Sequence, residues 1–198
     1  PEVPVNAVVG TIRYDGEVFE QAKIVGVVGK NQPFSFDFNT VSDKQHLTLR
    51  ANDAGKFLSG LNITDTLRRG ILKLTATRNR GKKQPWDGRF TISDYTVVNA
   101  PNLARILTLA SFTGILNRLL GKGIKFTKLV VPFSHFSNKT TIKNARAVGA
   151  ELGLTADGFL NLGMKTAKLR GTMVPAYSIN SVLGGIPFIG KIFTGEKG

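Results

Sequence analysis

Histidine and carboxylate side chains are the first candidates for a catalytic or metal-binding role in this chain. His46 and His135 are its only histidines, and neither falls in a metal-ligand spacing. Asp87, Asp94 and Asp157 stand alone in the sequence beside turns, so a carboxylate pair for acid–base chemistry would have to arise in space. The chain has no cysteine, which excludes disulfides, thiolate ligands and cysteine nucleophiles. These residues predict no catalytic centre, no metal site and no cofactor.

Phosphate-binding and hydrolase motifs are missing as well. Neither G-x-S-x-G nor a Walker sequence occurs, and the G-K-G-I-K run at 121–125 lacks the spacing of a phosphate loop. The polar chemistry that remains is basic: 27 Lys and Arg residues against 13 Asp and Glu residues give a net charge of +14. Such a charge implies attraction to polyanions, which leaves nucleic acid, anionic lipid and acidic protein open.

Basic and apolar residues alternate in the second half of the chain. The basic positions are Lys122, Lys125, Lys128, Lys139, Lys143, Arg146, Lys165, Lys168 and Arg170. This alternation fits an ordinary half-buried sheet with a soluble outside. It also fits a surface that holds acyl chains on one side and attracts phosphate headgroups near its rim. Binding of nucleic acid is disfavoured, because its binders interleave exposed aromatics with lysines, whereas the phenylalanines here share faces with aliphatic residues.

The secondary structure that positions these residues is predicted to be mostly β-strand. Period-two patterning between short turns predicts an antiparallel meander and not alternating βα units. The expected strands cover 5–14, 17–28, 34–38, 46–51, 71–77, 90–98, 124–133, 141–148, 154–160 and 165–174. A change of parity between Phe126 and Leu129 predicts a bulge near Thr127–Lys128. A short capped helix is expected at 52–61, followed by a polar connection at 62–69.

The stretch 99–120 is expected to be the only long helix, roughly 30 Å in length. Its apolar side changes near Ser111–Gly114, so the helix either kinks there or is covered on two sides. It is then either a buried core helix or a helix that lies over an apolar surface not fully closed by protein. The residues that would cover such a surface are Leu103, Ile106, Leu107, Ala110, Phe112 and Leu116.

Several segments resemble the C-terminal region of the AsmA-like family. They are D-A-G-K-F-L-S-G-L-N-I-T-D at 53–65, A-P-N-L-A-R-I-L-T-L-A-S-F-T-G-I-L at 100–116, G-K-G-I-K-F at 121–126, A-V-G-A-E-L-G-L-T-A-D-G at 147–158 and G-T-M-V-P-A-Y-S-I-N-S-V-L-G-G-I-P-F-I-G-K-I-F-T-G at 171–195. The resemblance spans roughly residues 50–195 in the family's order. Residues 1–50 carry only the general strand pattern.

The resemblance implies a fold, a location and a function. AsmA-like proteins are similar to the bridge-like lipid transfer and TamB-type proteins, which are not enzymes. Their strands curl into a groove with a hydrophobic lumen, along which phospholipids are thought to move between the inner and outer membranes of Gram-negative bacteria. Most are anchored in the inner membrane by an N-terminal helix, with the bulk in the periplasm. The family has no agreed point-like binding residues, so no functional residue is carried over.

We therefore predict a mainly β protein with helices, an antiparallel curled groove with one long and one short helix. Because the chain starts at Pro1, we expect 1–198 to be a single fragment of a larger protein, with sub-segments 1–98 and 99–198. The expected partners are phospholipids with anionic headgroups, membranes through the full-length protein, and other envelope proteins. Period-two placement makes the candidate groove floor Phe90, Ile92, Ile124, Phe126, Leu129, Val131 and Phe133. The alternatives are a structural module for outer-membrane assembly that carries no lipid, and a basic nucleic-acid-binding domain.

Overall fold

A single open antiparallel sheet forms the body of the molecule in the computed structural model, which describes residues 5–10, 21–28, 32–80 and 84–175, with side chains from residue 33 onward. The strands of this part are β1 (Val5–Gly10), β2 (Gln21–Val28), β3 (Gln32–Val41), β4 (Lys44–Ala51), β5 (Leu67–Asn79), β6 (Trp86–Val97), β7 (Ile124–Phe136), β8 (Lys139–Gly149), β9 (Leu152–Asn161), β10 (Thr166–Arg170) and β11 (Met173–Pro175). The helices are α1 (Ala54–Gly60), α2 (Pro101–Leu109) and α3 (Thr113–Leu120).

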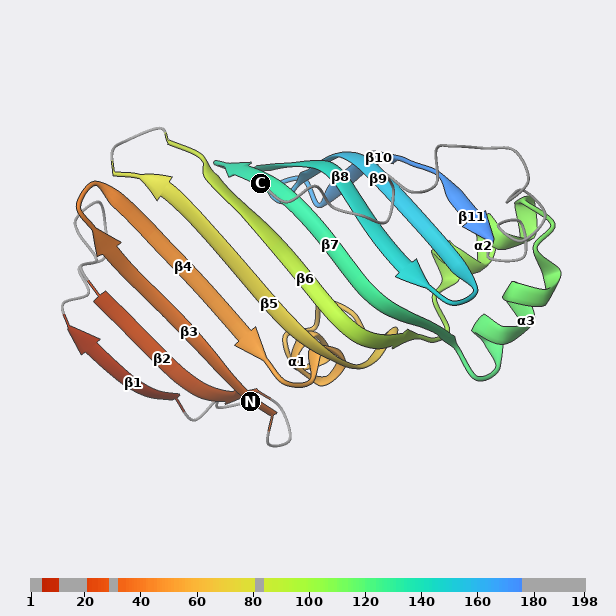
Figure 1. Ribbon diagram of the computed structural model, residues 1–198, viewed down its shortest axis with the longest axis horizontal. Helices are drawn as coiled ribbons and strands as arrows, with labels where there is room; N and C mark the ends of the chain where they lie inside the picture. Colours follow the sequence, from red (N-terminus) through yellow and green to blue (C-terminus); the bar gives the residue numbers. More distant parts are fainter. Residues whose placement is uncertain (1–4, 11–20, 29–31, 81–83, 176–198) are drawn as a thin grey trace.

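The strands follow one another in space as they do in the chain. Their order is β1 to β10 without a crossover, every pairing is antiparallel, and β11 pairs with β9 beside β10. β1 to β7 run side by side across the view of Figure 1, and the sheet then continues through β8 and β9. The predicted antiparallel meander is confirmed, including the β9–β10 hairpin. The predicted connection at 62–69 is wrong in its second part, because β5 already begins at Leu67.

The register separates an apolar face from a polar face. Cross-strand partners point to the same side of a sheet. One continuous row of partners reads Phe34, Ala51, Leu72, Ile92, Leu129, Ala147 and Leu154. The neighbouring row on the other side reads Ser35, Arg50, Lys73, Thr91, Val130, Arg146 and Thr155. The sheet is therefore built with one apolar side and one polar, largely basic side.

Three adjacent strands are interrupted at the same level. Gly70 and Asp94 have positive φ angles of 93° and 54°. Gly70 and Asp94 are not paired with each other where β5 runs beside β6. Asp94 and Thr127 are likewise not paired where β6 runs beside β7. The register of β7 against β8 shifts between Phe126 and Lys128, which confirms the predicted bulge. Residues three positions apart normally point to opposite faces of a sheet. The skipped residue Thr127 shifts the alternation by one position, so Phe126 and Leu129 both point to the apolar face.

The expected long helix is two helices, which corrects the prediction of one long and one short helix. α2 ends at Leu109, Ser111 takes a left-handed φ of 58°, and α3 begins at Thr113. The amide of Phe112 closes the turn by donating to the carbonyl of Leu107 at 2.8 Å. The cause is the change of apolar side in the sequence: one straight helix would expose half of it, whereas two helices bury Leu107 and then Ile115 and Leu119.

The helices lie against one end of the sheet. α1 is capped by Asp53, whose carboxylate accepts a hydrogen bond from the Lys56 amide at 2.9 Å. Its Phe57 ring packs on Phe34 of the apolar face, with centroids 5.5 Å apart. α2 and α3 lie together beside the start of β7 (Figure 1). Among the described residues, no helix is long and apolar enough to span a bilayer. Most of the segment 171–195, which resembles the AsmA-like family, lies outside the described residues.

Candidate functional site

A stripe of half-buried apolar side chains crosses the middle of the apolar face. It follows one line of cross-strand partners through five strands, and each member is only partly buried. This apolar stripe consists of Phe36, Leu49, Leu74, Phe90 and Val131. Four strand spacings make it about 19 Å long. The stripe runs across the strands, so no single strand reveals it.

The two ends of the apolar face differ on either side of this stripe. On the helix side, Ala51, Leu72 and Ile92 are at most 2% exposed and belong to the main core. On the opposite side, the Arg78 guanidinium donates to the side-chain oxygen of Gln45 and lies 4.6 Å from the centre of the Trp86 ring. The apolar face is therefore closed by helices at one end and bordered by polar groups at the other.

The predicted groove floor divides into two groups. Ile92, Ile124 and Phe126 are at most 2% exposed, and they pack inside the core beneath the helices. The remaining members are half-buried farther along the same face: Phe90, Leu129, Val131 and Phe133. The structure thus places all seven on one face, with the first group buried and the second group half-buried.

The six predicted covering residues of 99–120 also separate. Leu107 is fully buried, whereas Leu103, Phe112 and Leu116 are half-buried against the core. Ala110 is exposed in the turn between the helices, and Ile106 is 51% exposed. α2 and α3 thus cover the core end of the face, and Leu109 and Leu120 add to the apolar surface that they expose.

The two histidines and Asp157 have different surroundings in the structure. His46 pairs through the register with Thr77 on the polar face. His135 lies on the apolar face, where its Nδ1 is 2.8 Å from the hydroxyl oxygen of Thr140. Asp157 accepts a hydrogen bond from the Asn144 amide at 2.8 Å. No three His, Asp or Glu residues in the described ranges gather closely enough to hold a metal ion.

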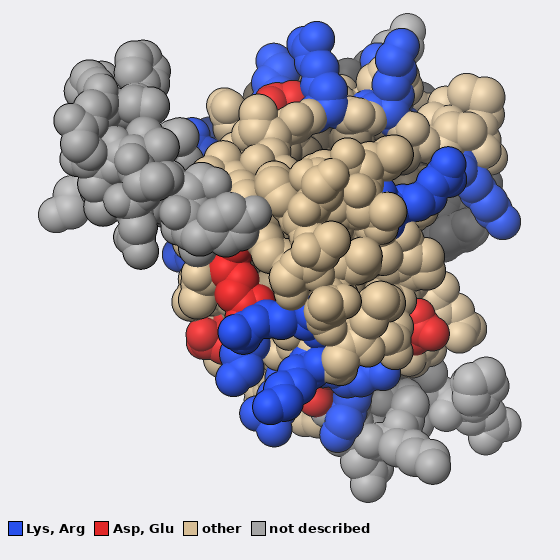
Figure 2. Space-filling view, turned by 90° about the vertical axis from the view of Figure 1, so that its right-hand side faces the viewer, with Lys and Arg blue, Asp and Glu red and all other residues tan. Residues whose placement is uncertain are grey.

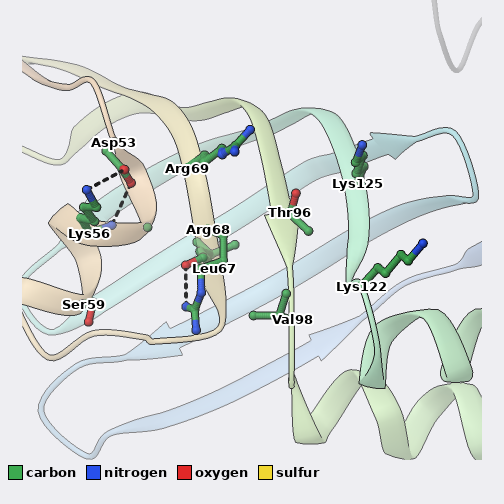
Figure 3. A pocket seen from close by; sticks show the side chains of 11 residues that line it. Asp53, Lys56, Ser59, Leu67, Arg68, Arg69, Thr96, Val98, Lys122 and Lys125 are labelled. Carbon is green, nitrogen blue, oxygen red and sulfur yellow. Dashed lines mark hydrogen bonds and ion pairs between the residues drawn. The ribbon is translucent and has the colours of Figure 1, made fainter.

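A basic pocket lies where β5 begins and β7 begins, next to α1 (Figure 3). It has a volume of about 710 Å³, within the range of ligand-binding clefts. Five cationic side chains line it: Lys56, Arg68, Arg69, Lys122 and Lys125. Ser59 and Thr96 contribute hydroxyl groups, Leu67 and Val98 contribute apolar surface, and Asp53 is the one carboxylate of the lining.

The register brings Arg68 and Lys125 into one row, and Arg69, which pairs with Tyr95, has a left-handed φ of 61° at the interruption of β5. Arg68 pairs with Thr96 across β5 and β6, and Thr96 pairs with Lys125 across β6 and β7. Figure 3 shows the side chains of Arg69 and Lys125 extending to the same side of the strands as the Thr96 hydroxyl. Sequence reasoning singled out Lys122 and Lys125 but missed Arg68 and Arg69, because it assigned them to a polar connection. The adjacent pair of arginines immediately before an apolar strand was the available signal.

Further basic side chains lie elsewhere on the surface. Lys139, Lys143 and Arg170 line a shallower hollow of about 350 Å³ between β8, β9 and β10. Figure 2 looks onto the end of the molecule that carries α2 and α3. Its middle is free of charged side chains, and Lys and Arg side chains gather above and below this uncharged zone.

Comparisons with known proteins leave the class to be defined by the fold alone. No family model matches the chain, and neither a curated protein nor a solved structure is significantly similar to it. The described part is a mostly antiparallel β protein with three helices and an open sheet. Its distinguishing features are the apolar stripe and the basic pocket.

Proposed function

We propose that this chain is a periplasmic segment of a lipid transfer protein anchored in the inner membrane. In this proposal its apolar face guides the acyl chains of phospholipids between the inner and outer membranes. The observation that carries the proposal is the apolar stripe, since five neighbouring strands each place one half-buried apolar side chain on the same line.

The partial exposure of the stripe suits transport better than storage. Burial of one CH₂ group stabilises by roughly 0.8 kcal/mol, so a fully enclosed chain of many such groups would be held too tightly to move. A chain lying on the stripe would be covered on one side only and would keep part of its surface free. The binding free energy for each carbon of the acyl chain would therefore be small, and it would be similar at each position along the stripe. Such binding permits the chain to slide.

The distribution of charge supports an amphipathic ligand. The polar face carries Arg50, Lys73 and Arg146 directly behind the apolar rows. A phospholipid with an anionic headgroup has the matching division into an oily part and a negative part. The resemblance of 53–65, 100–116 and 171–195 to AsmA-like segments adds the cellular setting of this proposal, the bacterial envelope.

Site-specific photocrosslinking tests the proposal with an internal control. A photoreactive residue at Val131, on the stripe, is expected to capture phospholipid in cells, whereas one at Phe126, buried in the core on the other side of the bulge at Thr127, is expected to capture none. Capture at neither position, with the protein folded, contradicts the proposal. Capture at both to the same extent also contradicts it, because reactivity would then not depend on access to the stripe.

A structural module that carries no lipid is the competing class. The apolar side chains exposed on α2 and α3, Ile106, Leu109 and Leu120, would suit a contact with another protein. Native mass spectrometry after gentle purification separates the two classes. Co-purifying phospholipid supports the conduit, and a lipid-free protein that retains protein partners supports the structural module.

A further inference from the structure

Like charges are concentrated in the basic pocket without compensation. Lys56 has a carboxylate partner, Asp53, 4.0 Å away. Arg68 donates to the backbone carbonyls of Asp65 and Leu67. No described carboxylate lies within ion-pair distance of Arg69, Lys122 or Lys125. Three cations without a carboxylate partner thus share one hollow, and their summed positive potential favours an anion there.

The arrangement of donors specifies the anion further. The cations come from β5, from the start of β7 and from the turn before it, and Arg69 and Lys125 extend to the same side of the strands as the Thr96 hydroxyl. A carboxylate offers a single charge to such a site. A phosphate monoester carries a charge of about −1.5 to −2 and three acceptor oxygens, which can be shared among several donors. The guanidinium fork of Arg69 matches two of these oxygens.

We propose that the basic pocket is a binding site for a phosphate monoester group, with Arg69 and Lys125 as its principal ligands. The apolar side chains of Leu67 and Val98 in the same lining leave room for the carrier of the phosphate. Two carriers share this chemistry: a phospholipid with a monoester headgroup and a small soluble phosphate ester. The assignment to a lipid rests on the proposed function, whereas the presence of a phosphate site does not.

The test compares two double variants of the 198-residue chain with equal loss of charge. Arg69→Gln with Lys125→Gln removes the two ligands from β5 and β7. Lys73→Gln with Lys128→Gln removes two exposed cations from the same strands outside the pocket. Glycerol 3-phosphate and dihexanoyl phosphatidic acid are titrated below micelle formation, and backbone amide shifts and dissociation constants are measured by NMR. Dihexanoyl phosphatidylcholine serves as the probe without a monoester.

We expect the monoester probes to shift the amide signals of Arg69, Thr96 and Lys125. Relative to the unaltered chain, the dissociation constant should rise at least fivefold in the Arg69→Gln, Lys125→Gln variant and stay within twofold in the Lys73→Gln, Lys128→Gln variant. Tighter binding of the lipid probe than of glycerol 3-phosphate identifies a headgroup, and equal binding identifies a soluble ester. Equal weakening in both variants, or no shift at these amides with either probe, overturns the site. A pocket that binds glycerol 3-phosphate while Val131 captures no lipid would contradict the proposed function alone.

Discussion

Tyr95 and Phe126 stack across β6 and β7 with ring centroids 5.3 Å apart and planes 10° from parallel. Both rings are nearly completely buried, and they lie immediately beyond the level at which Gly70, Asp94 and Thr127 interrupt the strands. This stack is part of the core under the helices, whereas Phe90 and Val131 of the same two strands are only half-buried. The core therefore extends past the interruption to Leu72 and Ile92, and the half-buried part of the apolar face lies beyond them, at Phe90 and Val131.

Replacement of Phe126 by alanine should strongly destabilise the protein. The variant removes a buried ring from the core and leaves a cavity, which typically costs about 3 to 5 kcal/mol. Phe136→Ala on the same strand is the matched control, since Phe136 is 48% exposed and its loss should cost less than about 1 kcal/mol. Urea unfolding measures both values. A similar midpoint for the two variants would show that the stack does not hold the core.

Stability should fall at high pH because of Tyr95. Burial raises the pKa of the Tyr95 hydroxyl above its ordinary value of 10.0. Above that pH the unfolded chain ionises at this tyrosine while the folded chain stays protonated. Ionisation lowers the free energy of the unfolded state, so stability is lost by up to about 1.4 kcal/mol per pH unit. Tyr95→Phe should flatten this loss between pH 10 and 12 in thermal or urea unfolding. An unchanged slope in the variant would contradict the role of the hydroxyl.

Asp157 should stabilise the bend in β8. Its carboxylate accepts a hydrogen bond from the amide of Asn144, which has a left-handed φ of 54° where the register of β8 and β9 shifts. Asp157→Ala should lower stability by about 1 kcal/mol and accelerate hydrogen exchange of the Asn144 amide. Asp65→Ala, which changes an exposed aspartate elsewhere, is the control. Unaltered exchange at Asn144 would argue against this role.

A polar residue on the apolar stripe should reduce lipid capture. Val131→Asn places an amide on the line where an acyl chain is proposed to lie, so the amount of co-purified phospholipid should fall several-fold. Val130→Asn is a close control, because Val130 is half-buried one position away and points to the polar face. The ratio of lipid to protein is read by native mass spectrometry, with circular dichroism to check folding. Equal losses from both variants would indicate general damage and not an apolar path.

Sequence patterning predicted the strands well because each depends on local alternation. The phenylalanines at 34, 36 and 38 fixed one face of β3, and the parity change between Phe126 and Leu129 located a bulge that the register of β7 confirms. The division of 99–120 into two helices was also present in the sequence as a change of apolar side, although the pattern alone allowed a kink or two-sided cover.

Contacts between distant segments decided what the pattern left open. Phe126 and Val131 read alike in the sequence as apolar strand residues, yet one is buried by the packing of helices and the other is only half-buried. Arg69 and Lys125 are 56 positions apart, and only the pairing of β5, β6 and β7 brings them into one pocket. The sequence by itself determined the antiparallel class, the two unlike faces and the excess of basic charge, since these follow from local period and composition. The tertiary structure decided which apolar residues stay accessible and which cations meet, because burial and proximity depend on the whole chain.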